Sequence, residues 1–360
     1  MKAAAFYDKR DIRIVDKPVP EPKADEIRVK VEWCGICGSD MHEYEGGPHG
    51  VPTMGHSGEH PLTHKTALPL VLGHEFSGTI DKLGPEVDTE KYKVGQRICV
   101  EPIITCGQCK LCRTGFENCC PKLGIIGVAD DGGFAEYALT RQHRVHLLPD
   151  NVSFEVGALI EPLCVAWHAV KQANFKMGQT ALVLGGGPVG LAVVKVLHTV
   201  GARSVYVSEL AEARKEYAKK AGATEVWDPR EVDVVQACKD RNADGLGVDV
   251  SFDCAGVPAS IRTAIRAVKP RGTILNVALW DRDVPVSLSE ITTGEKVLIG
   301  TCCMVDDFPA VIQAVSDGRL NTDGLITGKI SLEDIVDQGF EAIASARDKH
   351  VKILASPVKR

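Results

Sequence analysis

The feature that most constrains the fold is the apolar segment ALVLGGGPVGLAVVKVLHTVGA, which spans residues 181–202. Four glycines before position 191, a proline and a lysine argue against a membrane span and favour a strand, a tight turn and a helix. Gly185, Gly187 and Gly190 satisfy the pattern G-x-G-x-x-G between the expected strand and the expected helix. Glycines in this context let the backbone approach a pyrophosphate at the helix N-terminus, so the segment predicts a dinucleotide-binding site.

The residues that follow indicate which dinucleotide binds. Glu209 ends the next expected strand, nineteen residues past Gly190. A carboxylate there accepts hydrogen bonds from ribose hydroxyls and repels a 2′-phosphate, so NAD is favoured over NADP. Arg214 lies close enough in the sequence to offer a positive charge to such a phosphate, which keeps NADP open as an alternative. Three further candidates for contacts with the dinucleotide, each of which also suits plain core packing, are Val189, Val277 and Leu279.

The chain divides by composition into three stretches. Residues 1–155 are rich in Val, Ile, Pro and Gly, with short runs that read as strands between turns, which predicts a mostly β domain. In residues 156–297, apolar runs alternate with helical patterns, which predicts βαβ units and a doubly wound parallel sheet. Residues 298–360 mix short strands and helices without a clear period. The fold class expected is therefore α/β, with a nucleotide-binding domain beside a β-rich one.

Charge and cysteine content narrow the class of protein. The formal net charge is −6, which argues against nucleic acid or an anionic membrane as the main partner, because both favour a basic face. The first residues, MKAAAFYDKRDIRIVDKP, contain no long apolar core, so no secretory signal is indicated and a cytoplasmic location is expected. The thirteen cysteines should then be reduced, and five of them fall between Cys106 and Cys120, which points to metal binding.

Four of these cysteines have the spacing C-x2-C-x2-C-x7-C, at Cys106, Cys109, Cys112 and Cys120. Four thiolates at short intervals match tetrahedral zinc, and four protein ligands leave no open position, so the ion would be structural. An iron–sulfur cluster is a weaker reading, because it requires assembly and a redox partner. A nucleic-acid-binding zinc module lacks the basic stripe that it needs. Cys119 is interpreted as a bystander.

A second group of potential ligands is scattered along the chain. The segment WCGICGSDMHEY at 33–44 holds Cys37, LPLVLGHEFSG holds His74 and Glu75, and IEPLCVAWHAV holds Glu161. Such a mixed set suits a zinc ion that keeps one position for water or substrate. Spacing alone does not bring these residues together, and a disulfide or redox pair at Cys34 and Cys37 is the competing interpretation of the first segment.

Taken in order, CGICGSDMH, GHEFSG, the four cysteines and GGGPVG resemble the zinc-containing medium-chain alcohol dehydrogenases over essentially the whole chain. The resemblance implies a GroES-like catalytic domain, a Rossmann domain, and a return of residues 298–360 to the catalytic domain. It also implies one catalytic and one structural zinc, NAD as the cofactor, and a homo-oligomer, either a dimer or a tetramer. In related polyol enzymes an arginine at the position of Arg214 accompanies NAD. The ligands implied for the catalytic zinc are Cys37, His74, Glu75 and Glu161, whereas Cys34 is expected to pack in a strand.

The same resemblance gives the residues beside the catalytic zinc their roles. A zinc-bound alcohol loses its proton more easily, and Ser39 can accept that proton. His42, three residues later, can relay it toward solvent, because histidine is the side chain that ordinarily exchanges protons near neutral pH. Asp40 is expected to support a ligand.

The substrate is inferred from the branch of the family. The motifs around 33–44, 161–170 and 326–343 look most like the (R,R)-butanediol dehydrogenases, which implies oxidation of (R,R)-2,3-butanediol to acetoin and the reverse reduction. A sorbitol or polyol dehydrogenase is the alternative. Such enzymes carry Tyr after the relay His and a later Arg-Tyr pair, where this chain has Glu43 and Cys302-Cys303. A non-enzymatic dinucleotide-binding protein is a remote third reading, since it should have lost the ligands or the relay.

One segment falls outside these assignments. Residues 45–69 form a long expected loop. It is read as a solvated surface loop, with an additional metal-binding or subunit-contact loop as the alternative. Its four histidines are His49, His56, His60 and His64.

Overall fold

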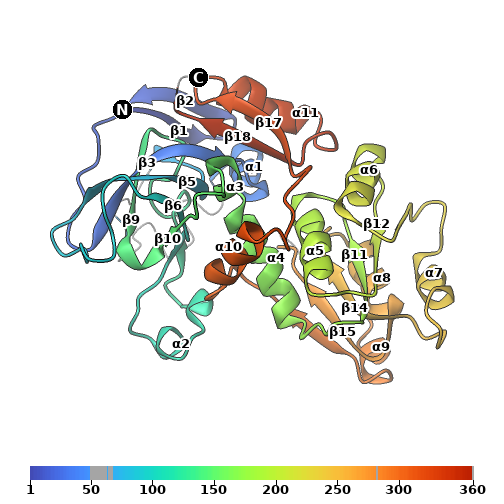
Figure 1. The fold of residues 1–360 in the computed structure, drawn as a ribbon. Coiled ribbons are helices and arrows are strands. Elements are labelled where there is room, and N and C mark those ends of the chain that lie inside the picture. The colour runs from blue at the N-terminus through green and yellow to red at the C-terminus, as the bar shows by residue number, and fades with distance from the viewer. Residues whose placement is uncertain (49–62, 64–67, 281–282, 359–360) are drawn as a thin grey trace. The chain divides into compact units, whose positions relative to one another are not determined.

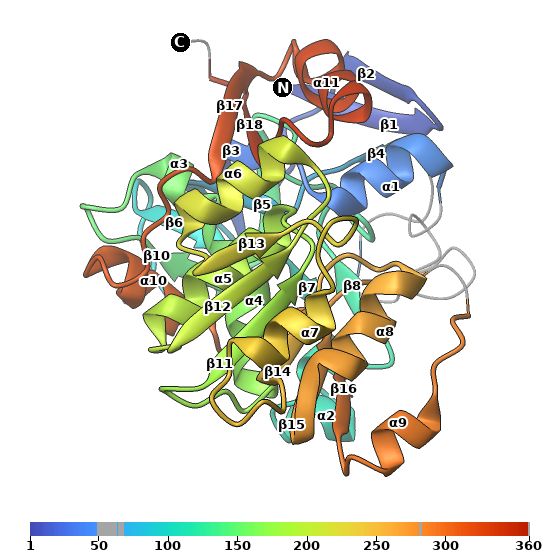
Figure 2. The ribbon, with the colours of Figure 1, turned by 90° about the vertical axis from the view of Figure 1, so that its right-hand side faces the viewer.

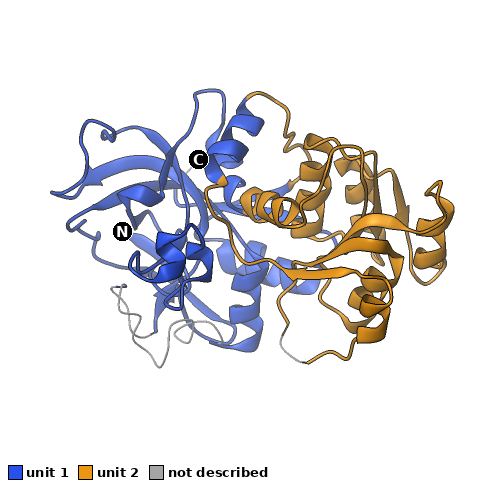
Figure 3. Cartoon of the chain, turned by 90° about the horizontal axis from the view of Figure 1, so that it is seen from below, with its two compact units in different colours: residues 1–161, 308–316, 326–360 blue, residues 162–307, 317–325 orange. Residues whose placement is uncertain are grey.

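The computed structural model describes residues 1–48, 63, 68–280 and 283–358, and the chain forms two compact units (Figures 1 and 3). Unit 1 comprises Met1–Glu161, Phe308–Ser316 and Ile326–Arg360, and unit 2 comprises Pro162–Asp307 and Asp317–Leu325. The last stretch of the chain, which shows no clear period, is therefore shared between the units. The four histidines of the expected 45–69 loop lie outside the described residues.

The main sheet of unit 1 has the strand order β10-β6-β5-β3-β18-β17, with β9 also pairing with β3. The central pair is antiparallel, and its register sets Cys34 opposite Phe76 and Gly35 opposite Glu75. The end of β3 and the start of β5 therefore lie side by side, although about forty residues separate them. The strands are β3 (Glu26–Gly35), β5 (Glu75–Leu83), β6 (Arg97–Val100), β9 (Tyr137–Arg141), β10 (Val145–Leu147), β17 (Ile326–Ser331) and β18 (Lys352–Ser356).

A smaller sheet of order β2-β1-β4 and a β7–β8 pair complete the β structure of unit 1. The apolar faces of these strands meet in a core that includes Phe6, Ile27, Val29 and Phe76, all at most 1% exposed. These strands are β1 (Lys2–Asp8), β2 (Asp11–Asp16), β4 (Leu70–Val71), β7 (Ile103–Ile104) and β8 (Gly124–Ile125). The helical segments are α1 (Gly38–Gly46), α2 (Lys110–Arg113), η1 (Glu117–Cys119), η2 (Gln142–Arg144), α3 (Phe154–Gly157), α10 (Phe308–Ser316), η3 (Ile335–Phe340) and α11 (Glu341–Ser345).

Unit 2 contains a six-stranded parallel sheet of order β13-β12-β11-β14-β15-β16. Numbered along the chain, this is the 3-2-1-4-5-6 order of the doubly wound dinucleotide-binding fold, whose strand order reverses between β11 and β14. The sequence-based prediction of a parallel α/β sheet is confirmed. The strands are β11 (Thr180–Leu184), β12 (Ser204–Ser208), β13 (Glu225–Trp227), β14 (Val248–Asp253), β15 (Val268–Asn276) and β16 (Val297–Gly300).

Helices connect these strands and cover the sheet. The helix α5 packs on β11 and β12, while α8 packs on β14 and β15, and α7 and α8 lie in front of the sheet in Figure 2. The glycine motif is required where α5 begins, because a Cβ at Gly190 would collide with the carbonyl oxygen of Gly185. None of the described helices is long and apolar enough to cross a membrane. The helices are α4 (Ile160–Gln172), α5 (Pro188–Thr199), α6 (Glu212–Ala221), α7 (Val234–Asp240), α8 (Pro258–Ala267) and α9 (Leu288–Thr292).

Candidate functional site

The turn between β3 and α1 places the first of the expected zinc ligands. Cys37 is the N-cap of α1, and its backbone N–H donates to Oδ2 of Asp40 at 2.8 Å. Asp40 thus closes the helix start by accepting the N-cap amide, as one half of a capping box does. The neighbouring Cys34 is fully buried in β3, as expected for a packed strand residue.

The structure brings Cys37 together with His74 and Glu75, the residues at the start of β5. The Sγ of Cys37, a ring nitrogen of His74 and a carboxylate oxygen of Glu75 all lie within 4.8 Å of one another. We call these three residues the mixed cluster. Gly35 makes it possible, because a Cβ at that position would collide with Oε2 of Glu75. The antiparallel register of β3 and β5 therefore brings together residues that are far apart in the sequence.

A buried carboxylate lies beside the histidine of this cluster. Asp40 is 1% exposed, accepts from the backbone N–H of Gly73 at 3.3 Å, and has Oδ1 3.7 Å from Nδ1 of His74. Burial lowers the pKa of His74, but the negative charges of Asp40 and Cys37 outweigh it and leave the pKa well above its ordinary value. Electron-rich surroundings of this kind also favour a bound cation.

Lys352 is a member of the site that the sequence did not indicate. Its Nζ donates to Oε1 of Glu75 at 2.6 Å and to the carbonyl oxygen of Ile36 at 3.1 Å. Both charged side chains are almost completely buried. Burial lowers the pKa of Lys352, yet the charge of Glu75 outweighs this and raises it. Lys352 lies in β18, 277 residues from Glu75, so only the pairing of β18 with β3 could have revealed it.

Glu161, the fourth expected ligand, lies in the first turn of α4 and is 8% exposed. Its carboxylate is not among the donors that lie within 4.8 Å of one another. Burial raises its pKa to about 7, and the charges of His74 and Glu75 act on it in opposite directions. Glu161 therefore belongs to the same electrostatic environment as the mixed cluster without being one of its three closest donors.

The two expected proton carriers lie on α1. The Oγ of Ser39 lies 3.3 Å from Nε2 of His74, which places the hydroxyl beside the mixed cluster. His42 is exposed and stands three residues later on the same helix. Residues three apart lie on one face of a helix, so the two side chains share the face of α1 that runs from the cluster toward solvent.

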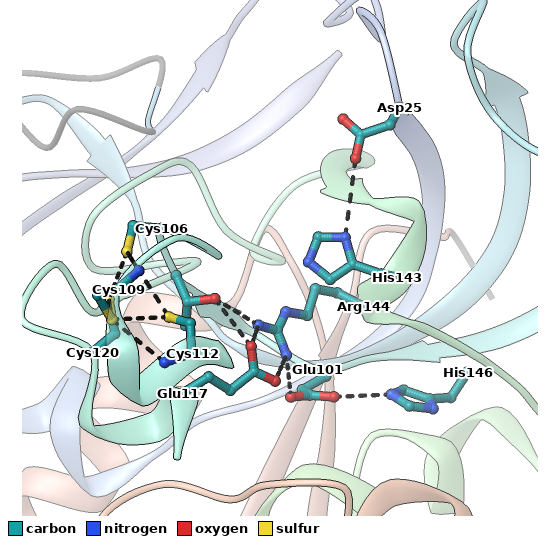
Figure 4. Close-up of polar contacts among 11 residues, drawn as sticks. Asp25, Glu101, Cys106, Cys109, Cys112, Glu117, Cys120, His143, Arg144 and His146 are labelled. Carbon is teal, nitrogen blue, oxygen red and sulfur yellow. Dashed lines mark hydrogen bonds and ion pairs between the residues drawn. The ribbon is translucent and has the colours of Figure 1, made fainter. Parts of the chain in front are cut away.

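The four expected cysteines of the other zinc site converge in what we call the four-cysteine lobe, residues 106–120 (Figure 4). Their Sγ atoms are separated by 3.4 to 4.0 Å in the pairs that contact one another. Backbone N–H groups, chiefly that of Gln108, lower the pKa of Cys106 to about 6, which favours the thiolate needed for metal binding. The donors fit a structural zinc ion, with no position left open.

Arg144 ties this lobe to the main sheet. Its guanidinium donates to Glu101 Oε1 at 2.6 Å and to Glu117 Oε2 at 2.6 Å, and Figure 4 shows it between the two carboxylates. Glu117 begins the short helix that ends just before Cys120, whereas Glu101 follows β6 and also contacts His146 at 3.1 Å. Arg144 is 4% exposed. The lobe is therefore anchored by a buried ion-pair network that sequence reasoning missed.

The glycine-rich turn of unit 2 is closed by Glu209. The Oε2 of Glu209 accepts from the backbone N–H of Gly186 at 2.6 Å, and the side chain is 7% exposed. Gly185 adopts φ +96°, a conformation that favours glycine. Glu209 therefore lies directly against the glycine motif, where the end of β12 meets the beginning of α5.

The other candidates for contacts with the dinucleotide differ in how exposed they are. Val189 and Val277 are partly exposed, and Leu279 is 80% exposed, so packing in the core does not account for Leu279. The backbone carbonyl oxygen of Arg214 lies near Gly186, since a Cβ on that glycine would be 3.4 Å from it. Gly187 caps α5, and Pro188 starts it.

Comparisons with known proteins agree with this geometry. Residues 23–150 match the alcohol dehydrogenase GroES-like domain, and residues 188–317 match the zinc-binding dehydrogenase family. The chain is 38% identical over 384 residues to the (R,R)-butanediol dehydrogenase of Saccharomyces cerevisiae, covering 99% of this chain and 98% of that protein. It is 35% identical over 359 residues to the sorbitol dehydrogenase of Bacillus subtilis, covering 99% and 97%.

The fold is also similar to that of a solved dehydrogenase structure. The 2R,3R-butanediol dehydrogenase of Bacillus subtilis aligns with a TM-score of 0.91 at 38% identity, covering 99% of both chains. The chain belongs to the zinc-binding alcohol dehydrogenase family, with a GroES-like domain and a Rossmann-type domain. It is an oxidoreductase of that family, and the resemblance inferred from its motifs is confirmed.

Proposed function

We propose that this oxidoreductase interconverts (R,R)-2,3-butanediol and acetoin, with NAD as the hydride acceptor. The observation that carries the proposal is the convergence of Cys37, His74 and Glu75 within 4.8 Å in a chain that is similar to butanediol dehydrogenases over its full length. A donor set of one thiol, one imidazole and one carboxylate is typical of a catalytic zinc that keeps a position for substrate.

In this proposal Cys37, His74 and Glu75 hold the catalytic zinc, and Glu161 completes the set from α4. A zinc ion bound there would polarise an alcohol hydroxyl and lower its pKa. The chain supports such an ion with negative charge, since Asp40 lies 3.7 Å from Nδ1 of His74. Lys352 holds the carboxylate of Glu75 at 2.6 Å and keeps it from turning away. The four-cysteine lobe holds the second, structural zinc.

The proton of the alcohol leaves through α1. Ser39 accepts it, because the hydroxyl lies beside the mixed cluster, 3.3 Å from Nε2 of His74. His42 takes the proton from Ser39 and releases it, because its imidazole is exposed to solvent and histidine is a common general base. Ser39 thus supplies a hydroxyl beside the buried donors, and His42 supplies an imidazole in contact with solvent. A proton relay requires one group of each kind.

NAD, the hydride acceptor in this proposal, would be held by the glycine turn of unit 2. Gly185, Gly187 and Gly190 admit the pyrophosphate, and Glu209 accepts from the ribose hydroxyls. Glu209 is already held by the backbone N–H of Gly186, which fixes its carboxylate against the turn. Val189, Val277 and Leu279 would contact the dinucleotide, and the 80% exposure of Leu279 leaves its side chain open to such a contact.

The choice of a diol over a polyol rests on what replaces the polyol-binding residues. Burying several hydroxyls without partners is costly, so a polyol site needs several polar groups. This chain has thiols and the buried Met304 in place of the later Arg-Tyr pair, and Glu43 in place of Tyr. A small diol or hydroxyketone suits that set better. Sorbitol oxidation is the second candidate, favoured by the 35% identity to a sorbitol dehydrogenase.

Initial rates with NAD on (2R,3R)-butanediol, its (2S,3S) isomer and sorbitol, at matched concentrations, test the proposal. We expect the highest rate with the (2R,3R) diol, and zinc measured on the same sample at two ions per chain. A higher rate with sorbitol would contradict the assigned substrate while leaving the zinc and NAD assignments intact. Rates with NADP that exceed those with NAD would contradict the role given to Glu209.

The proposal extends to the setting in which the enzyme works. A reducing, cytoplasmic location fits two sites that depend on thiolates, because disulfides would remove the ligands. The chain is proposed to form a homo-oligomer, either a dimer or a tetramer, as its family resemblance implies. Light scattering on the purified protein gives the oligomeric state directly.

A further inference from the structure

Two consecutive cysteines follow β16 in unit 2, and their sulfurs lie close together. The Sγ of Cys302 is 3.7 Å from the Sγ of Cys303. Successive side chains of an extended chain point to opposite sides, so neighbouring thiols would ordinarily lie far apart. Cys302 is exposed, and Cys303 is partly exposed. The short separation therefore requires a local departure from the extended backbone.

Cys303 supplies that departure. Its φ is +50°, in the left-handed region that favours glycine, so a residue with a side chain is strained there. Such strain persists only where neighbouring structure holds the turn. Asp307, which is 1% exposed, accepts from the backbone N–H of Val305 at 2.9 Å and from Nζ of Lys171 at 2.7 Å. Met304, which follows Cys303 directly and precedes Val305, is buried and so holds the backbone next to the two thiols.

The spacing of the two thiols lets both bond to one metal or metalloid centre after a small rotation of their side chains. Bonds of about 2.3 Å to sulfur place two thiolates roughly 3.3 Å apart at a bond angle near 90°, as at pyramidal trivalent arsenic, and roughly 3.8 Å apart at the tetrahedral angle. The sulfurs of the four-cysteine lobe are separated by 3.4 to 4.0 Å, which brackets the 3.7 Å found for Cys302 and Cys303. A disulfide would instead require the sulfurs to approach to about 2.05 Å. The observed 3.7 Å is therefore nearer to the spacing of a chelate than to that of a disulfide.

The electrostatics of the pair also favour binding of a metal or metalloid centre. A hydrogen bond from the Cys303 thiol lowers the pKa of Cys302 to about 7; burial opposes this effect, and the nearby charge of His168 adds to it. A thiolate is the form that binds soft metals and attacks electrophiles. Cys302 therefore offers a thiolate near neutral pH beside a second thiol.

We propose that Cys302 and Cys303 form a bidentate site for soft, thiophilic ligands, with trivalent arsenicals as the simplest class. An organic arsenic oxide reacts with both thiols to form two arsenic–sulfur bonds. The arsenic–oxygen bond breaks, and the oxygen leaves with the two thiol protons as water. No electrons are transferred and no oxidant is needed. Because Cys302 and Cys303 supply two donors, the bound centre keeps its own organic group, unlike an ion in the four-cysteine lobe.

The place of the pair gives binding a consequence. The strands β15 and β16 are parallel. At their carboxyl ends, the backbone N–H of Thr301 donates to the carbonyl oxygen of Asn276 at 3.2 Å. The thiols thus stand beside residues 277–280 at the carboxyl edge of the sheet, where doubly wound folds bind nucleotides. An occupied pair inhibits NAD-dependent turnover, a consequence that rests on the proposed function.

Titration of the zinc-loaded enzyme with phenylarsine oxide, followed by intact-mass spectrometry, tests the site. We expect one adduct per chain that a dithiol reverses, with zinc content unchanged. Cys302→Ser and Cys303→Ser should each weaken binding by at least about 100-fold, because one thiol loses the advantage of chelation. Cys119→Ser is the matched control, since it also removes an exposed cysteine but should leave the adduct in place.

An adduct that persists in both Cys302→Ser and Cys303→Ser, or one that forms only as zinc is lost, would overturn the proposed site. The mass measurement does not depend on any substrate, so its result stands even if butanediol is not oxidised. An adduct on Cys302 and Cys303 without loss of turnover would overturn the inhibitory consequence alone.

Discussion

The two groups of metal-binding residues in unit 1 are built in opposite ways. The four-cysteine lobe takes all its donors from fifteen consecutive residues, and three of its four cysteines are partly exposed. The mixed cluster takes Cys37 from the β3–α1 turn and its other donors from the start of β5, and His74 and Glu75 are buried. A local loop can wrap an ion by itself, whereas the mixed cluster exists only once the sheet has formed.

Each group also depends on a buried cation from a distant part of the chain. Arg144 joins Glu117 of the lobe to Glu101 beside the sheet, and Lys352 joins Glu75 of the mixed cluster to β18. In the lobe, Arg144 binds Glu117, which is not a zinc ligand, so the ion pair holds the loop in place without contacting the metal-binding sulfurs. In the mixed cluster it contacts a ligand candidate directly. The comparison suggests that disturbing the lobe should affect stability, and disturbing the cluster should affect chemistry.

The largest effect should follow Cys37→Ala. Loss of this donor removes Lewis-acid stabilisation that is worth several kcal/mol, so turnover should fall by about 1000-fold or more. Steady-state rates and zinc content measure the loss, and NAD affinity, measured by fluorescence titration, should stay near that of the parent enzyme. Cys34→Ala is the matched control, because Cys34 is a buried cysteine three residues away that contributes no ligand. Near-normal rates for Cys37→Ala would contradict the catalytic-zinc assignment.

Cys109→Ala should instead lower stability. A structural zinc contributes its binding energy to folding, so the melting temperature should fall by several degrees and zinc content by one ion per chain. The exposed Cys119 provides the control, since Cys119→Ala removes a thiol from the same loop without removing a ligand. If Cys109→Ala kept both its zinc and its melting temperature, the structural role of the lobe would be wrong.

The same contrast explains what the sequence could reveal. The lobe was readable because C-x2-C-x2-C-x7-C encodes its geometry locally, and the nucleotide fold was readable because strands and helices alternate around GGGPVG. The mixed cluster needed the family resemblance, since residues 37 and 74 meet through the β3–β5 register. Lys352 and Arg144 carried no signal, because a single basic residue in a strand or short helix has no pattern that distinguishes it from a surface residue.

Arg144→Met tests whether the anchor of the lobe is as important as its ligands. Removing the guanidinium leaves Glu101 and Glu117 without their buried cation, which should lower the free energy of unfolding by about 3 kcal/mol. Chemical denaturation measures this change. Arg13→Met is the control, because its pair with Asp11 is largely exposed and should contribute less than about 1 kcal/mol. Equal effects of the two substitutions would mean that the buried network does not anchor the lobe.

Ser39→Ala should give the smallest of these effects and the one most specific to the mixed cluster. Positioned proton transfer contributes about 100-fold to a rate, so turnover should fall by that order while zinc content and melting temperature stay unchanged. The pH dependence of turnover separates a relay from simple packing, since loss of the relay should make the rate rise more steeply with hydroxide concentration. Ser39→Thr restores a hydroxyl at the same place, 3.3 Å from His74 in the parent, and should recover most of the rate. If both variants lost activity equally, the serine would act through its size, and the proton would leave the site by another path.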